Sequence, residues 1–271
     1  MPRKPVIVIE GDAPPEIDYD AVRAEEEALK NSRPSPEPAP APSRSPLDGL
    51  YILMPHTGKY ALGVHALQDA CSKDPTSTHP QSTLPDGSRI YRPLTFKENV
   101  EALVNEYERP RSTDERLRLF QRWNDSCTGV AYKAGSTRFK IIPESVELIT
   151  IDKEFNQGFL PVVYDGIPGI ELDSSTGKYN TLLTKDEVLS HPAWLAAVGG
   201  DAALLRTYRD IVFAEKAGST RLMRFWVPQN TPTDELRALF VSNLNFNSDA
   251  DGNNYLNSSG SFLRVAHVVA P

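Results

Sequence analysis

The sequence has only two cysteines, Cys71 and Cys127, among its 271 residues. Neither belongs to a C-x-x-C pair, and neither stands at metal-ligand spacing from the five histidines, so the sequence offers no zinc site. Proteins that are not secreted rarely form disulfide bonds. We therefore predict that both thiols are reduced and lie in the core.

Long hydrophobic runs are also missing. The longest ones, Val6–Ile9 and Leu160–Tyr164, are far shorter than the roughly 20 residues that span a bilayer. The N-terminus lacks the apolar core of a signal peptide, so we expect no membrane segment and a cytoplasmic location. With a net charge of -7 and no clustered Lys and Arg, a nucleic-acid partner is not expected either.

No hydrolase, P-loop, zinc-protease or dinucleotide-binding motif occurs, and we therefore expect no enzymatic activity. Two groups of residues could still carry chemistry: the set His56, His65, His79 and Cys71, and the pair Glu144 and Glu147. A Cys/His nucleophile pair is conceivable in the first group, but His65 falls on the apolar side of a predicted helix, where a packed histidine is commoner. Glu144 and Glu147 are three apart in a predicted extended segment, so they should point to opposite faces.

The proline content divides the chain in two. Residues 1–47 hold ten of the 23 prolines, and residues 33–42 alternate proline with small or polar residues. Such a segment buries little apolar surface, so we predict a disordered, acidic and proline-rich tail. Within it, residues 1–30 are either a solvated tail or a docking peptide for a partner. Residues 48–271 are predicted to form a single folded domain.

Helices and strands are mixed irregularly in the predicted domain, which favours an α+β fold over a doubly wound sheet. We expect helices over 60–71, 95–108, 114–125, 184–216 (split at Gly199-Gly200) and 231–240, and strands over 51–54, 129–133, 138–142, 146–151, 222–227 and 262–269. Capping boxes mark helix starts at Thr95–Glu98 and Thr184–Glu187. The apolar side of the first helix is predicted to carry Leu62, His65, Ala66 and Ala70.

The most unusual stretch is 242–261, because six of the chain's 13 asparagines lie between Asn243 and Asn257. Asn, Ser, Gly and Tyr are also the residues that antibody binding loops favour. The alternatives are a merely solvated loop and a recognition surface. A capped helix predicted before the stretch and an apolar strand predicted after it favour the second alternative.

Calcium is a further alternative for the same stretch. Asn247, Asp249, Asp251 and Asn253 match the alternating oxygen ligands of an EF-hand loop, and Gly252 supplies the turn. The match fails at position twelve, which is Ser258 rather than glutamate, and a strand rather than a helix follows. Without calcium, no cofactor is expected.

The end of the chain, Ser261–Ala266, follows an Asn/Ser/Asp/Tyr-rich segment and resembles the C-termini of variable proteins of diversity-generating retroelements. In that family a reverse transcriptase copies a template repeat and mutates its adenines, which converts asparagine codons into those for Ser, Asp, Tyr, Gly and similar residues. Leu244, Leu256 and Gly260 look like the fixed positions between variable ones. Leu50–Pro55 and Arg92–Glu98 are similar to segments of proteins from small-genome archaea.

The resemblance implies a C-type-lectin fold of the kind shared with formylglycine-generating enzymes, in which the last strand lies near the first. Ser-Phe-Leu-Arg-Val replaces the family's Gly-Phe-Arg-Val pattern here, and the catalytic cysteines of those enzymes have no counterpart in Cys71 or Cys127. The resemblance also implies a non-catalytic protein that binds a protein or other macromolecule through 242–261; the competing interpretation is a structural or assembly protein.

The residues that the recognition hypothesis assigns to the ligand-binding surface are Asn243, Asn245, Phe246, Asn247, Ser248, Asn253, Asn254, Tyr255, Ser258, Ser259 and Ser261. Leu244, Leu256, Phe262, Leu263 and Val265 are expected to form the core beneath it.

Overall fold

The computed structural model describes residues 50–56, 59–109, 117–241, 244 and 247–266. The tail predicted over 1–47 lies outside the described residues. The strands are β1 (Leu50–His56), β2 (Gln81–Thr83), β3 (Arg89–Tyr91), β4 (Asn124–Tyr132), β5 (Arg138–Ile142), β6 (Leu160–Pro161), β7 (Ile170–Asp173), β8 (Leu183–Thr184), β9 (Arg221–Leu222), β10 (Phe225–Trp226), β11 (Glu235–Val241), β12 (Ala250–Asp251) and β13 (Gly260–Ala266). The helices are α2 (Tyr60–Ser72), α3 (Phe96–Glu108), α5 (Val146–Ile149), α6 (Lys185–Ser190), α7 (Pro192–Ala197) and α8 (Ala202–Glu215).

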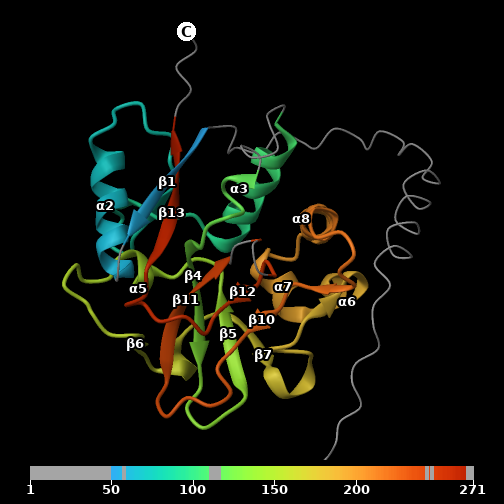
Figure 1. Cartoon of the computed structure of the whole chain (residues 1–271). Coiled ribbons are helices and arrows are strands. Elements are labelled where there is room, and N and C mark those ends of the chain that lie inside the picture. The colour runs from blue at the N-terminus through green and yellow to red at the C-terminus, as the bar shows by residue number, and fades with distance from the viewer. Residues whose placement is uncertain (1–49, 57–58, 110–116, 242–243, 245–246, 267–271) are drawn as a thin grey trace, which may run out of the picture. The chain divides into compact units, whose positions relative to one another are not determined.

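One large sheet organises the domain. Its strands follow the order β1-β13-β4-β11-β12-β10, with β5 and then β7 continuing from β4, and with β6 beside β11. The first and last strands, β1 and β13, pair antiparallel along their whole length, from Leu50 opposite Ala266 to His56 opposite Gly260 (Figure 1). The first and last strands of the domain thereby lie side by side at one end of the sheet. The mixture of helices with this sheet confirms the predicted α+β class.

The sheet carries an apolar cluster on each face, because successive residues of a strand point to opposite sides. In β4, Val130 and Tyr132 belong to the larger cluster, which includes Trp194 of α7, whereas Ala131 belongs to the smaller one. The smaller cluster contains Tyr60 of α2. Helices α3, α7 and α8 contribute to the larger cluster, and α2 and α5 to the smaller, so helices cover both faces of the sheet.

Both predicted capping boxes are confirmed: in Thr95–Glu98 and in Thr184–Glu187, the threonine side chain and the glutamate side chain each accept a backbone N–H bond. The predicted break at Gly199-Gly200 is also confirmed. Both glycines have positive φ angles, of 64° and 79°, which end α7 before α8 begins. Both cysteines are buried and free, as predicted. In the described part of the chain, no helix is both long and apolar enough to cross a bilayer.

Three predicted elements are wrong. Residues 146–149 form helix α5 rather than a strand, because Ser145 caps it by accepting a hydrogen bond from the Leu148 N–H. Residues 235–241 form strand β11 rather than a helix, because pairing with β4 outweighs the local cap signal at Thr231–Asp234. Residues 118–121 form turns, residue 122 is a bend and β4 begins at Asn124, so the helix predicted over 114–125 does not extend that far.

The predicted apolar side of the first helix is wrong as well. Helix α2 buries Tyr60, Val64 and Leu67 against the sheet, whereas Leu62 is 38% exposed and Ala66 is exposed. The helix is therefore rotated relative to the predicted stripe, because Tyr60 and Gly63 rather than Leu62 meet the aromatic ring of Phe262.

Candidate functional site

The Asn/Ser-rich stretch is anchored to the domain by buried leucines. Leu244 and Leu256 are 5% and 4% exposed, and Phe262, Leu263 and Val265 are buried too, as predicted. Around Leu256 the backbone is fixed on both sides: its N–H donates to the Gly158 carbonyl at 2.7 Å, and its carbonyl accepts from the Tyr60 N–H at 2.8 Å. The residues next to Leu256 therefore project from a fixed backbone rather than from a free loop.

The predicted surface residues differ in exposure. Asn253, Tyr255 and Ser259 are exposed, and Asn247, Asn254 and Ser258 are half-buried. Asn243, Asn245 and Phe246 lie outside the described residues. The exposed and half-buried members could all reach a ligand without unfolding of the domain.

Ser248 and Ser261 were assigned wrongly to the surface. Ser248 is fully buried, and its hydroxyl bonds to that of Tyr208. Ser261 is 4% exposed, and its hydroxyl donates to the Trp123 carbonyl at 2.6 Å. Both serines satisfy buried polar groups of the scaffold, a role that their residue type alone did not reveal.

A pocket of about 510 Å³ opens beside the exposed residues, and we call it the Tyr255 pocket. Its size is in the range of small-molecule sites. Side chains that carry amides, rings and one guanidinium line it, among them Asn180, Trp226, Gln229, Arg237, Asn253 and Tyr255. Of these, only Asn253 and Tyr255 were predicted from the sequence.

Arg237 organises the Tyr255 pocket. Its guanidinium pairs with Glu235 at 2.6 Å, and its Nη1 donates to the backbone and side-chain oxygens of Asn253 at 2.6 and 3.0 Å. The same guanidinium lies 4.7 Å from the centre of the Tyr255 ring. Because Glu235 and Arg237 are 1% and 5% exposed, this buried ion pair is a rigid support for two exposed residues.

The sequence interpretation missed Glu235 and Arg237 because it placed them on a helix. In a strand, residues two apart share a face. A strand predicted over 235–241 would therefore have placed the Glu235 and Arg237 side chains next to each other.

The Tyr255 ring rests on the backbone at Gly158. A Cβ atom at position 158 would lie 2.5 Å from Cδ1 of the ring, so only glycine permits this close contact. The ring is thus held between Gly158 and Arg237 and is still 53% exposed. A preorganised, half-exposed tyrosine is a typical anchor of binding surfaces.

Asp249 and Asp251 bear on the calcium interpretation. The Asp249 carboxylate accepts hydrogen bonds from the Arg224 backbone, the Arg224 guanidinium and the Trp226 indole N–H. Asp251 belongs to β12, and burial raises its pKa to about 6. Over the described ranges, no group of three or more His, Cys, Asp or Glu side chains is placed to hold a metal ion. The occupied carboxylate and the strand geometry both count against an EF-hand-like loop here.

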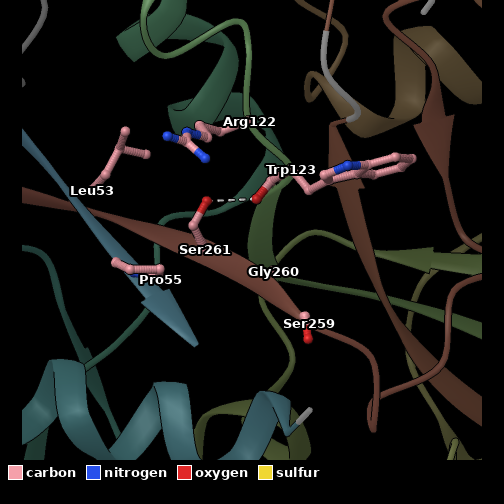
Figure 2. Close-up of a pocket in the computed structure, with 7 residues that line it drawn as sticks. All are labelled: Leu53, Pro55, Arg122, Trp123, Ser259, Gly260 and Ser261. Atoms are coloured by element: carbon pink, nitrogen blue, oxygen red, sulfur yellow. Dashed lines mark hydrogen bonds between the residues drawn. The ribbon is translucent and has the colours of Figure 1, made fainter. Parts of the chain in front are cut away.

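A second pocket, of about 410 Å³, lies at the C-terminal end of the Asn/Ser-rich stretch, and we call it the Trp123 pocket. It is lined by Leu53 and Pro55 of β1, by Arg122 and Trp123 before β4, and by Ser259, Gly260 and Ser261. Figure 2 shows the Arg122 side chain extending toward β1 and the Trp123 ring pointing the other way. Ser259 is therefore exposed at a different pocket from the one that contains Tyr255.

The histidines of the first chemical group have separate partners. His56 Nε2 lies 2.9 Å from Asp125 Oδ2, and His65 Nε2 lies 2.9 Å from the Ile151 carbonyl. His79 Nε2 contacts the Arg92 carbonyl at 2.7 Å, and burial lowers its pKa to about 4.

Cys71, Glu144 and Glu147 also have surroundings or partners that belong to the folded domain. Burial raises the pKa of the Cys71 thiol, which disfavours the thiolate that a nucleophile needs. Glu144 pairs with Arg92 at 3.0 Å, and Glu147 accepts a hydrogen bond from Ser145. The two carboxylates have different partners, although the extended segment assumed for them is wrong.

Neither a protein-family model nor a curated protein matches the sequence. Among solved structures, one described as "Accommodation of massive sequence variation in Nanoarchaeota by the C-type lectin fold" superposes with a TM-score of 0.54 at 16% sequence identity. The superposition covers 81% of this chain and 99% of that chain. With the paired first and last strands and the mixed sheet described above, this similarity shows that the domain has the C-type lectin fold.

Proposed function

We propose that this chain is a recognition protein that binds a macromolecular ligand through the side chains around the Tyr255 pocket. The observation that carries the proposal is the arrangement of Asn253 and Tyr255, which are exposed but fixed by the buried Glu235–Arg237 pair. Interfaces gain most of their affinity from such preorganised aromatic anchors, with amide and hydroxyl groups around them.

The proposal extends to diversification. The similar solved structure is described in terms of massive sequence variation accommodated by this fold. In the present chain, exposed positions alternate with buried ones, as Tyr255 and Asn257 flank Leu256. Variation at the exposed positions changes the ligand, and constancy at the buried positions keeps the fold. The enzyme and assembly-protein interpretations gain no comparable support from a described site.

A library of the full chain tests the proposal. Positions 253, 254, 255 and 257 are randomised with the codons that adenine mutation of asparagine codons produces, and the variants are displayed on yeast. We expect most members to fold, as judged by protease resistance, and selection on immobilised hen lysozyme to enrich binders. A matched library at the buried positions 244, 256, 262, 263 and 265 should lose protease resistance. Equal loss in both libraries would contradict the proposal.

Sequencing of the gene region tests the diversification half separately. A reverse-transcriptase gene and a near-identical repeat that differs only at adenines should lie nearby. Failure to find them, together with a successful display selection, would leave recognition supported and reject diversification.

A further inference from the structure

Strand β1 forms one end of the large sheet. In the described part of the chain its one strand neighbour is β13, so no described strand pairs with the opposite edge of β1, which we call the open edge. An open edge offers unpaired N–H and C=O groups to any extended chain that comes alongside. Which groups β1 offers follows from the ladder that it forms with β13.

The N–H groups of Ser261 and Val265 point away from β1. Ser261 donates to the Trp123 carbonyl at 3.0 Å, and Val265 donates to His79 Nδ1 at 3.1 Å. In an antiparallel ladder, facing residues alternate between hydrogen-bonded and non-hydrogen-bonded pairs. Ser261, Leu263 and Val265 therefore occupy the non-hydrogen-bonded pairs of the β1–β13 ladder.

Their partners in register are Pro55, Leu53 and Tyr51, whose backbone groups consequently face the open edge. Two observations agree with this assignment. The Tyr51 carbonyl accepts a hydrogen bond from Arg118 Nη2 at 3.1 Å, outside the ladder. Pro55 has no N–H to donate, and proline is tolerated in a strand where its nitrogen faces away from the partner strand. Over the described ranges, the N–H and C=O of Leu53 have no other partner.

The side chains along the open edge differ between the two faces. On the α2 face, Ile52 is 44% exposed, and it offers an apolar contact. On the other face, Leu53 and Pro55 border the Trp123 pocket, and two cations lie close by. Arg118 is half-exposed beside Tyr51 and lies 3.8 Å from the buried Glu106 carboxylate. Arg122 is an exposed member of the pocket, and its side chain extends toward Leu53 (Figure 2). Arg122 has no carboxylate partner among the described residues.

These features together define one kind of occupant. We propose that the open edge of β1 binds an extended segment of a partner protein in which acidic and β-branched residues alternate. The segment adds to the sheet as a further strand and exchanges backbone hydrogen bonds with Leu53. Its acidic side chains lie on the face of Arg118 and Arg122, and its apolar side chains lie against Ile52. This surface is separate from the Tyr255 pocket, so the proposal does not depend on the recognition function.

The probe for the test is an acetylated seven-residue peptide that alternates valine and glutamate, and the control peptide alternates valine and lysine. Both are titrated into the full chain, and amide hydrogen exchange is followed at Leu53. The valine–glutamate peptide should slow exchange of the Leu53 amide by about tenfold or more at saturation, because this N–H becomes hydrogen-bonded. Added salt should weaken the effect, because exposed charges are screened.

Substitutions separate the charge contribution from the backbone contribution. Arg122→Gln should weaken binding of the valine–glutamate peptide by about threefold, within the range of one exposed charge pair. Arg118 is left unchanged in this test, because it also pairs with the buried Glu106 carboxylate. Arg138→Gln, which removes an exposed cation of β5, is the matched control and should leave binding unchanged. Ile52→Lys should abolish binding while the melting temperature stays the same, because Ile52 is an exposed side chain.

Three results would overturn the proposal. The first is unchanged exchange at Leu53 with saturating valine–glutamate peptide. The second is equal binding of the valine–lysine peptide. The third is protection of the Leu53 amide before any peptide is added, because the edge is then already filled. Protection that rises with protein concentration would identify a second copy as the occupant, and protection that does not would identify another part of the same chain.

Discussion

The guanidinium of Arg237 lies 4.7 Å from the centre of the Tyr255 ring, while the same side chain is ion-paired with Glu235 beneath the surface. An exposed residue of the candidate site is thus connected directly to a buried charge pair. Changes in the support should therefore affect both stability and the ligand-binding surface, whereas changes in the exposed residues should affect the surface alone.

Arg237→Met should lower the free energy of unfolding by about 3–5 kcal/mol, because it leaves the Glu235 carboxylate buried without its partner. The double variant Glu235→Met with Arg237→Met should recover most of that loss. Denaturant unfolding measures both. Arg138→Met, which breaks an exposed pair with Glu171, is the control and should cost about 0–1 kcal/mol. A similar loss in Arg138→Met and Arg237→Met would contradict the prediction.

Tyr255→Ala and Asn254→Ala should change the free energy of unfolding little, by about 0.5–1 kcal/mol, since neither side chain is fully buried. Leu256→Ala and Leu263→Ala should each cost about 2–5 kcal/mol, because they open cavities in the core. Thermal melts compare the four variants. Equal losses in Asn254→Ala and Leu263→Ala would reject the division between surface and core positions.

Gly260→Ala should destabilise the domain by about 1–3 kcal/mol, in the range of overpacked sites. A Cβ atom at this position would lie 1.9 Å from Oδ2 of Asp125, the atom that bonds to His56. Denaturant unfolding should detect the loss. Gly166→Ala is the matched control, since a Cβ atom at position 166 meets nothing within 4 Å, and its midpoint should not move.

Asp251 should make the domain less stable as the pH rises from about 4 to about 6. Its pKa in the folded state is raised to about 6, mainly by burial, above a value of about 3.9 in the unfolded chain. The folded state therefore binds the proton more tightly, and its advantage is complete below pH 4 and lost above pH 6. The lost stability is on the order of 1–3 kcal/mol.

Denaturant unfolding of the wild type and of Asp251→Asn between pH 4 and 7 measures this contribution. The difference between the two proteins should change steadily over that interval and should level off above pH 6. His79 and His191, whose pKa values are lowered to about 4, give slopes of opposite sign that cancel in the difference. A difference that is flat with pH would show that Asp251 does not titrate differently in the two states.

Much of the fold could be predicted from local patterns. The strands at 138–142 and at the C-terminus, and the helices with a capping box, are confirmed because their signals lie within a few residues of each other. The helix predicted over 231–240 failed for the opposite reason. Its cap signal is local, but its strand structure depends on β4, which is more than 100 residues away along the chain.

The candidate site could be predicted only in part. Asn253 and Tyr255 were found because their residue types are typical of binding surfaces. Ser248 and Ser261 have the same kind of side chain, yet they bond inward to Tyr208 and to the Trp123 backbone. A polar residue in the sequence does not reveal which way it points when the partner that satisfies it is distant along the chain.

The pairing of Leu50 with Ala266 also determines when the domain can be completed during synthesis. Strand β13 lies between β1 and β4, so the sheet stays divided until the ribosome has released the last residues of β13. A chain that terminates early anywhere in the Asn/Ser-rich stretch lacks β13 and leaves β1 without its neighbour. Such a product should be recognised as unfolded and degraded, so that only chains completed through the final strand accumulate in the cell.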